Sequence, residues 1–138
     1  MVTTEIALSA DRAEDFKELE GLLQNLDNAR VICRREEPID LMLRERISWF
    51  NQRHPPDMII ASYRRPFTDL KVIADLKKLP AFQWVPVVVI VDEEIKNTRI
   101  KFLEFGVTQV LTWKSGEHAV IESLVHMFGE VEVPVVAT

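Results

Sequence analysis

The segment 56–66 contains the residue that is best placed to take part in chemistry. The run 58–61 is short and continuously apolar, which is typical of a strand buried on both faces of a parallel sheet. Ser62 follows this run and stands at the carboxyl end of the predicted strand. In an open α/β sheet, ligands bind and reactions take place at that edge. Position 62, and the side chains that converge on it, therefore decide the functional interpretation.

Other residue types that often carry out chemistry stand in patterns that favour structural roles. The histidines His54, His118 and His126 fall on different predicted elements or at no metal-ligand spacing, which favours surface positions. Cys33 lies in an apolar run and is expected to be a packed strand residue. There is no G-x-G-x-x-G or Walker pattern, and Ser62 is not part of a G-x-S-x-G elbow. We therefore expect no catalytic residues, no cofactor and no enzyme activity.

The composition indicates one globular domain. The 138 residues are 47% hydrophobic and 28% charged, with a net charge of -5. This charge argues against non-specific nucleic-acid binding, and the runs 34–35 and 64–65, each two arginines, are interpreted as solvated surface. The single cysteine excludes an intramolecular disulfide and fits a reducing cytoplasm. With no signal peptide and no apolar run near the roughly 20 residues that cross a bilayer, a cytoplasmic protein without membrane contact is expected.

Apolar periodicity predicts five strands that alternate with five helices. The strands are expected at residues 6–8, 30–33, 58–61, 86–91 and 108–112, and the helices at 12–28, 38–54, 67–79, 92–106 and 115–130. This order predicts an α/β fold, (βα)5, with a doubly wound, five-stranded parallel sheet and helices on both faces. A domain boundary is expected after residue 130, and residues 131–138 are expected to form a C-terminal arm or the start of a linker.

Several residues are predicted to set helix ends or to lie outside the core. Glu14 and Asp15 fall in the first turn of the first helix, where negative charge suits the helix dipole. Gly106 is placed as the C-terminal cap of the fourth helix and Ser115 as the N-cap of the fifth. Leu41 falls opposite the apolar face of the second helix and is expected to be exposed.

Three segments, taken in order, resemble the receiver domain of two-component response regulators, the CheY-like (flavodoxin-like) fold. The sequence PDMII at 56–60, with Pro66, is similar to the family's third strand and the loop after it. The sequences LKKLP at 76–80 and VPVVV at 85–89 are similar to its third helix and fourth strand. The sequence FGVTQVLT at 105–112 is similar to the turn into its fifth strand. The resemblance spans about residues 4–129. It implies a receiver-like domain over residues 1–130.

A working receiver, as the resemblance implies, needs five polar groups at the carboxyl edge of the sheet. Two adjacent acids after the first strand help to bind Mg²⁺, and an Asp at the end of the third strand accepts the phosphoryl group. A Thr or Ser after the fourth strand and a Lys after the fifth bind phosphate oxygens. These residue types suit the reaction because Mg²⁺ prefers hard oxygen ligands, and because metal and lysine neutralise charge during transfer.

This sequence departs from the family pattern at most of the matching positions. The acidic pair falls on Ala10 and Asp11, the acceptor on Ser62, the Thr/Ser position on Val91, the switch aromatic on Val110, and the lysine on Trp113, with Lys114 one residue later. A serine carries no charge to bind Mg²⁺ and would form a phosphoester instead of a labile acyl phosphate. Valine cannot donate a side-chain hydrogen bond, and tryptophan has one N–H and no charge. No metal site is expected, unless Asp11 retains a residual Mg²⁺ site.

These losses, together with the resemblance, predict a degenerate receiver, or pseudo-receiver: an atypical response-regulator domain of two-component signal transduction that acts through phosphorylation-independent protein contacts. By family analogy, the partner is a kinase, an assembly factor or a second copy in a homodimer. The contact face is expected on the fourth helix, fifth strand and fifth helix, with Ile95, Phe102, Val110 and Trp113 as candidates.

Two alternatives stay open from the sequence. The crevice expected at the carboxyl edge could bind a small anionic ligand or a nucleotide, because helix N-termini bind anions without requiring a particular side chain. The chain could also be the regulatory part of a longer protein that carries an output domain.

Overall fold

A computed structural model of the chain describes residues 3–39, 41–44, 55–64, 71–92, 96–116, 118–120 and 122–127. Its strands are β1 (Thr4–Ala10), β2 (Ala29–Arg35), β3 (Met58–Tyr63), β4 (Val87–Val91) and β5 (Gln109–Thr112). Its helices are α1 (Ala13–Gln24), α3 (Lys71–Lys78) and α4 (Lys96–Glu104), with the short 3₁₀ turns η1 (Pro80–Phe82) and η2 (Trp113–Ser115). Residues 41–44, 118–120 and 122–127 are also helical.

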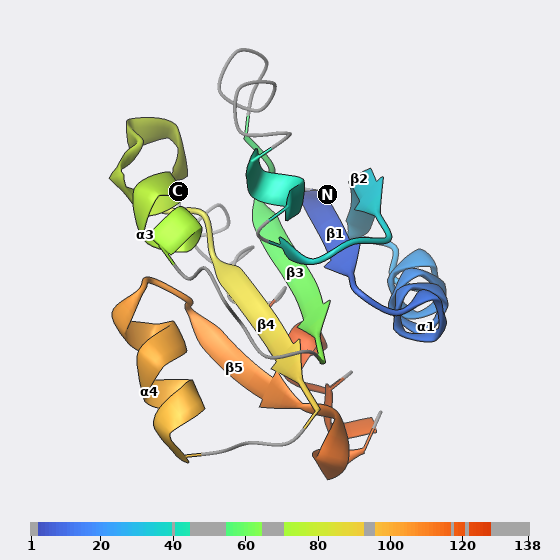
Figure 1. Ribbon diagram of the computed structural model, residues 1–138. Helices are drawn as coiled ribbons and strands as arrows, with labels where there is room; N and C mark the ends of the chain where they lie inside the picture. The colour runs from blue at the N-terminus through green and yellow to red at the C-terminus, as the bar shows by residue number, and fades with distance from the viewer. Residues whose placement is uncertain are drawn as a thin grey trace.

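The strands form one parallel sheet in the order β2-β1-β3-β4-β5 (Figure 1). The predicted α/β fold with a five-stranded parallel sheet is therefore confirmed. The chain runs outward from β1 to β2 and then returns to β3 on the other side of β1, so the order reverses between β1 and β3. At this reversal the carboxyl ends of β1 and β3 are neighbours, and Ala10 pairs with Ser62. Such a switch point is where open α/β sheets usually place their functional sites.

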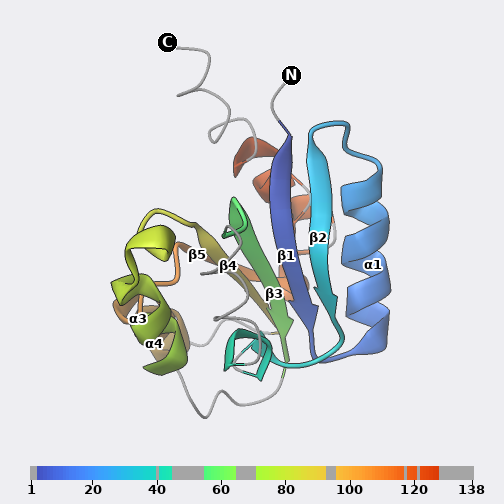
Figure 2. The same ribbon diagram turned by 90° about the horizontal axis from the view of Figure 1, so that it is seen from above.

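Helices cover both faces of the sheet, as predicted. Figure 2 shows α1 on one side of the strands and α3 and α4 on the other. All residues of β3 and β4 are buried. Burial on both faces explains why these two strands are almost entirely apolar, with Ser62 of β3 as the polar exception.

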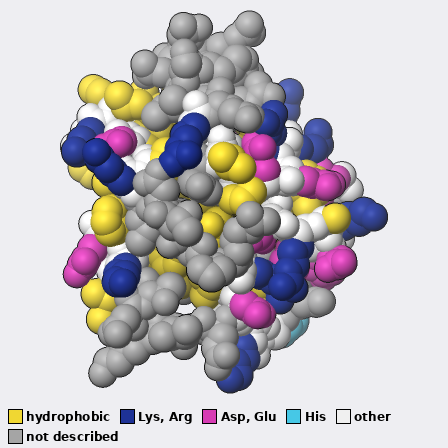
Figure 3. Space-filling view, in the orientation of Figure 1, with side chains coloured by type: hydrophobic (Ala, Val, Ile, Leu, Met, Phe, Trp, Pro, Cys, Tyr) yellow, Lys and Arg dark blue, Asp and Glu magenta, His cyan; other side chains and the backbone are white. Residues whose placement is uncertain are grey.

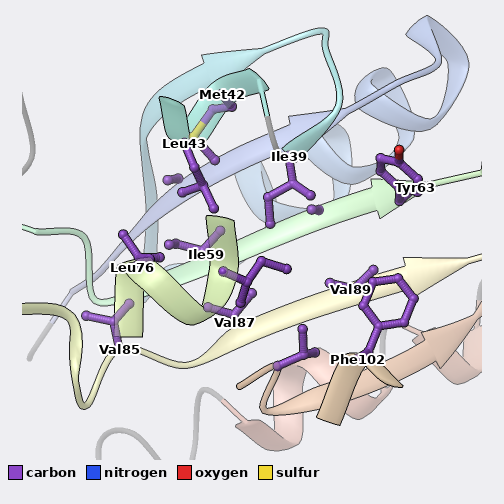
Figure 4. Packing of buried hydrophobic residues seen from close by; sticks show 14 of the residues in the cluster. Ile39, Met42, Leu43, Ile59, Tyr63, Leu76, Val85, Val87, Val89 and Phe102 are labelled. Atoms are coloured by element: carbon purple, nitrogen blue, oxygen red, sulfur yellow. The ribbon is translucent and has the colours of Figure 1, made fainter. Parts of the chain in front are cut away.

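Alternate strand residues contribute to two separate cores. On the side of α3 and α4, Ile59 and Val89 pack with Leu43, Leu76 and Phe102, as the close view in Figure 4 shows. The opposite core combines Leu8, Ile60 and Ile90 of the strands with Leu19 of α1 and Leu124 of the last helical segment. Because both cores use the same strands, side chains pack against the sheet from both sides.

Helix α1 ends earlier than its apolar periodicity predicts. It stops at Gln24, and Asn25 forms the C-cap, with its backbone N–H donating back into the last turn. Leu26 lies beyond the helix but still packs against the core on the α1 side. The apolar pattern therefore continues past the helix because a turn residue shares the same core.

The other predicted ends agree only in part with the structure. Gly106 follows α4 with a φ of 101° and donates its N–H to the carbonyl of Leu103 at 3.1 Å, which confirms the predicted C-terminal cap. Ser115 lies within η2, which is capped by Thr112. The Val120 N–H of the following helical segment donates to the carbonyl of Gly116, so that segment begins one residue later than predicted. Leu41 is exposed, as predicted. Residues 45–54, 65–70, 93–95 and the predicted arm 131–138 lie outside the described residues.

Candidate functional site

The carboxyl edge of the sheet brings six polar or aromatic side chains together. They come from the loop after β1, the start of α1, the end of β3, the residue after β4 and the turn after β5: Asp11, Asp15, Ser62, Arg64, Asp92 and Trp113. We call these six residues the edge cluster. They surround the end of β3, so this strand places the two central members, Ser62 and Arg64.

The guanidinium of Arg64 is the centre of the edge cluster. Its Nε donates to Asp15 Oδ2 at 2.6 Å and its Nη2 to Asp15 Oδ1 at 2.9 Å, while its Nη1 donates to Asp92 Oδ1 at 2.8 Å. The exposed fractions of the side chains are 20% for Arg64, 9% for Asp15 and 60% for Asp92. The bidentate pair with Asp15 is thus the desolvated, strong contact, and the pair with Asp92 is screened by solvent.

The carboxylate of Asp11 accepts hydrogen bonds from the backbone of Arg64. The backbone N–H of Arg64 donates to Asp11 Oδ2 at 3.0 Å, with Oδ1 at 3.3 Å. In return, the Asp11 N–H donates to the carbonyl of Ser62 at 3.3 Å. These two contacts join the loop after β1 to the end of β3.

Ser62 is fully buried, and its hydroxyl is engaged on both sides. It donates to Asp15 Oδ2 at 3.1 Å and accepts from Trp113 Nε1 at 2.9 Å. Arg64 also lies over the Trp113 ring, with Cζ 5.5 Å from the ring centroid, which is within cation–π distance. A hydroxyl has a single hydrogen to donate, so the hydrogen of Ser62 is committed to Asp15.

A second set of contacts connects the ends of β4 and β5. Thr112 Oγ1 donates to the carbonyl of Asp92 at 3.1 Å and accepts from the backbone N–H of Lys114 at 3.1 Å. Through the Arg64–Asp92 pair, these bonds continue the network that begins at Asp11. One connected set of polar contacts therefore joins the ends of β1, β3, β4 and β5.

The positive charge of the cluster is provided by the chain itself. The hydrogen bond with Asp15 raises the pKa of Arg64 above its ordinary value, burial opposes that effect, and the nearby charges of Asp15, Asp92 and Asp11 add to it. The guanidinium is consequently charged throughout the physiological range, and it faces three carboxylates.

The residues at this edge do not fit a bound Mg²⁺ ion. Mg²⁺ needs carboxylate oxygens that are free to join a nearly octahedral shell. Both carboxylate oxygens of Asp15 accept hydrogen bonds from Arg64, and those of Asp11 accept the Arg64 backbone N–H. Within the described part of the chain, no group of three or more His, Cys, Asp or Glu side chains could hold a metal ion. We therefore assign these residues no step that uses a metal.

The structure brings together three of the residues predicted for the degenerate phospho-acceptor pocket: Asp11, Ser62 and Trp113. Val91 is placed elsewhere. It is 6% exposed and belongs to the core on the side of α3 and α4, whereas Ser62 contacts α1 through Asp15.

The two remaining predicted pocket residues lie at its margins. Ala10 is fully buried in the core on the α1 side and pairs with Ser62 in the sheet. Lys114 is exposed next to Trp113, and its backbone amide takes part in the cap of η2.

The predicted contact face needs correction at two positions. Phe102 is 1% exposed and Val110 is 4% exposed, so both are core residues, and Figure 4 shows Phe102 packed among the strand side chains. The exposed large apolar residues of α4 are Ile100 and Leu103, at 48% and 45%. Ile95 lies outside the described residues.

Two members of the edge cluster, Arg64 and Asp15, are absent from the pocket that the sequence predicts. The interpretation of Arg64 as solvated surface is wrong, and Asp15 does more than favour the helix dipole. One sequence signal could have found them. Asp15 stands four residues after the predicted pocket residue Asp11, and Arg64 stands two residues after Ser62, so both fall near the carboxyl ends of predicted strands.

The described surface is mixed in charge. On the face seen in Figure 3, basic side chains in dark blue and acidic side chains in magenta are interspersed, with apolar side chains between them. Among the described residues, no helix has the length and apolar character needed to span a membrane.

The chain has the fold of response-regulator receiver domains. The signal receiver domain of the response regulator NarL from Mycobacterium tuberculosis is similar to it with a TM-score of 0.72 and 14% identity, over 94% of this chain and 98% of that one. The Mn²⁺-bound form of response regulator Rcp1 gives 0.67 and 20%, over 94% and 91%. A pilus assembly-related protein from Burkholderia pseudomallei gives 0.72 and 17%, over 92% and 90%. No family model and no curated protein matches the sequence. At these identities the likeness establishes the CheY-like fold, and function has to be argued from the residues.

Proposed function

We propose that this chain is a receiver-like signalling module that acts through protein contacts and without phosphorylation. The observation that carries the proposal is the edge cluster. Arg64 and Trp113 are bound to Asp15 and Ser62 at the edge where the resemblance places phosphoryl chemistry. An edge that holds its own guanidinium against the Asp15 carboxylate, beside Trp113, has less to gain from Mg²⁺ or a phosphoryl group.

The position of Ser62 supports the absence of a phospho-acceptor. Its side chain is fully buried, and its hydroxyl hydrogen is donated to Asp15. A phosphoryl donor would have to displace Trp113 and then place a dianion against the Asp15 carboxylate. Like charges in so buried a position repel strongly.

The residues that would pass a phosphoryl signal to β5 are also replaced. Val91 and Val110 stand where the resemblance expects a hydroxyl and an aromatic side chain, and both are buried in the core on the side of α3 and α4. An aliphatic side chain has no donor group and cannot form a hydrogen bond with a phosphate oxygen. This supports an output that does not depend on phosphorylation.

We propose that the partner binds the side of the molecule formed by α4, β5 and the last helical segment. Its exposed apolar residues are Ile100, Leu103 and Val125, which are between 45% and 48% exposed, and Trp113 borders it at the carboxyl edge. A kinase, an assembly factor or a second copy of the chain would each fit such a face. One of the proteins with this fold is described as pilus assembly-related, and the others reported above are response regulators.

The decisive test is an amide NMR titration with Mg²⁺ followed by beryllofluoride, which imitates an aspartyl phosphate. We expect the amides of Asp11, Ser62 and Trp113 to remain unchanged. A receiver domain with an intact acceptor aspartate, treated in parallel, serves as the positive control. Shifts at these amides that spread along β5 would overturn the proposal, as would Mg²⁺-dependent labelling by acetyl phosphate.

The alternative of a small anionic ligand at the same edge has less support, because the Arg64 guanidinium is already paired with two carboxylates. A thermal-shift screen of nucleotides and phosphates separates the two functions. A ligand at a hundredfold excess over its dissociation constant would stabilise the protein by about 2.7 kcal/mol. We expect no such stabilisation.

A further inference from the structure

The Trp113 side chain is held from two directions. Its Nε1–H donates to Ser62 Oγ at 2.9 Å, and its ring lies under the Arg64 guanidinium, 5.5 Å from Cζ to the ring centroid. The backbone at Trp113 is fixed as well, because its carbonyl accepts the Gly116 N–H at 2.9 Å within the turn that follows β5. The orientation of the indole is therefore set by Ser62 and Arg64.

Both of these residues are held by one carboxylate. Asp15 Oδ2 accepts from Ser62 Oγ at 3.1 Å and from Arg64 Nε at 2.6 Å, and Oδ1 accepts from Arg64 Nη2 at 2.9 Å. Asp15 is the third residue of α1 and is only 6% exposed. A desolvated carboxylate with three charge-directed contacts fixes its donors more firmly than an exposed one does.

We propose that Asp15 is a positioning residue: through Ser62 and Arg64 it sets the direction in which the Trp113 indole is presented at the end of β5. The first turn of α1 is thereby coupled to the border of the proposed contact face, although Asp15 and Trp113 share no direct hydrogen bond among the contacts described above. The inference deepens the proposed function, since it assigns to the start of α1 the control of a residue next to the partner.

Other acids of the cluster cannot replace Asp15 in this role. Asp11 binds the backbone N–H of Arg64, and Asp92 binds only Nη1 from a largely exposed position. Asp11 meets Ser62 through the backbone, where its N–H donates to the Ser62 carbonyl, whereas Asp15 is the acid whose carboxylate accepts the Ser62 hydroxyl in the described network. The serine hydroxyl is the hydrogen-bonded link, because it accepts the Trp113 N–H and donates to Asp15, and Arg64 is the second link, through its contact with the Trp113 ring.

The test uses the full chain with Asp15→Asn, Asp15→Glu and Ser62→Ala substitutions, and follows the indole N–H of Trp113 in ¹⁵N NMR spectra. Tryptophan-to-phenylalanine variants assign the indole signals. Ser9→Ala is the matched control, because Ser9 is also fully buried, lies on the neighbouring strand β1, and donates to the carbonyl of Glu37 instead. The indole of Trp84, which is 85% exposed, is the internal reference.

We expect Asp15→Asn to shift the Trp113 indole signal and to accelerate its hydrogen exchange by about tenfold, as the loss of an orienting hydrogen bond implies. Ser62→Ala should do the same, and Asp15→Glu, which keeps the charge, should restore part of the protection. Ser9→Ala should leave the Trp113 signal unchanged, and Trp84 should not respond to any variant. A Trp113 signal unchanged in a folded Asp15→Asn variant overturns the proposal, as does an equal shift in Ser9→Ala.

This outcome is separable from that of the beryllofluoride titration. If beryllofluoride binds and Asp15→Asn still disturbs Trp113, the phosphorylation-independent function fails while the positioning role stands. If beryllofluoride does not bind and Asp15→Asn leaves Trp113 unchanged, the positioning role fails while the proposed function stands.

Discussion

Arg64 and Asp15 are separated by 49 residues in the sequence and form a two-point contact, with Nε and Nη2 of the arginine donating to the two carboxylate oxygens. This pair joins the end of β3 to the start of α1. It is the best shielded charge contact of the edge cluster, because Asp15 is 9% exposed and Arg64 20% in their side chains. Its removal should therefore be costly, since each partner would leave the other in a partly desolvated site.

Arg64→Met should lower the free energy of unfolding by about 3 kcal/mol, near the lower end of the range for removing one partner of a buried pair. Arg30→Met is the control, because Arg30 is exposed on the edge strand β2, and it should change stability by no more than about 0.5 kcal/mol. Urea unfolding of both variants measures the difference. Equal losses in the two variants would mean that the Asp15 pair contributes no special stability.

Lys77 makes stability depend on alkaline pH. Its Nζ donates to the Val85 carbonyl oxygen, and burial lowers the pKa of this lysine below its ordinary value of 10.5. Between the lowered pKa and 10.5 the unfolded state binds more protons than the folded state, so stability rises with pH in that window. Lys77→Met should remove this rise. Lys78→Met, at a side chain that is 77% exposed, should keep it in urea unfolding from neutral pH upward.

The corrected contact face can be tested with two adjacent residues of α4. Phe102→Ala should cost about 3–5 kcal/mol, because it empties a fully buried site between the helix and the sheet. Leu103→Ala should cost about 0.5 kcal/mol or less, because Leu103 is 45% exposed. Thermal or urea unfolding gives both values. A small loss of stability in Phe102→Ala would mean that Phe102 lies at the surface, as the sequence-based prediction placed it.

Gly106 and Gly116 share a positive φ but differ in their surroundings. A Cβ at Gly106, where φ is 101°, would lie 3.0 Å from Cγ of Lys77, whereas a Cβ at Gly116, where φ is 96°, would meet nothing within 4 Å. Gly116→Ala should cost about 1–3 kcal/mol for the backbone alone, because a φ of 96° with a ψ of 152° is a conformation that essentially only glycine adopts. Gly106→Ala should cost more, because Lys77 must also move. If Gly116→Ala lowers the free energy of unfolding more than Gly106→Ala does, the contact with Lys77 does not add to the cost at Gly106.

The sheet and its two cores could be predicted from the sequence because the signals are local. The runs 58–61 and 87–90 contain no polar residues, which is typical of a strand that is covered on both faces. Both runs are buried in the structure. Phe16 and Leu19 lie on one apolar stripe and both pack on the same side of the sheet. The end of α1 was missed because Leu26 follows the same apolar period although it lies in a turn.

The edge cluster could be predicted only in part, because its contacts are long-range. Ser62 and Trp113 could be predicted because each stands at or next to the carboxyl end of a strand, and parallel strands bring such ends to one edge. The contribution of Arg64 depends on Asp15 of another element, and no local pattern links residues so far apart. From its local sequence, Arg64 is predicted to be a surface arginine, and Asp15 is predicted to be an acidic residue in the first turn of a helix. Only the fold shows that each desolvates and neutralises the other.

The cation at the carboxyl edge of the sheet is the guanidinium of Arg64, so it is covalently part of the chain whose carboxylates bind it. A site that takes its cation from solution empties on dilution or in the presence of a chelator, and its occupancy follows the supply of that ion. The effective concentration of a tethered group is set by chain geometry instead. Arg64 cannot be washed away, because it is part of the chain. The cation that faces Asp15 at this edge is therefore inherited with the sequence.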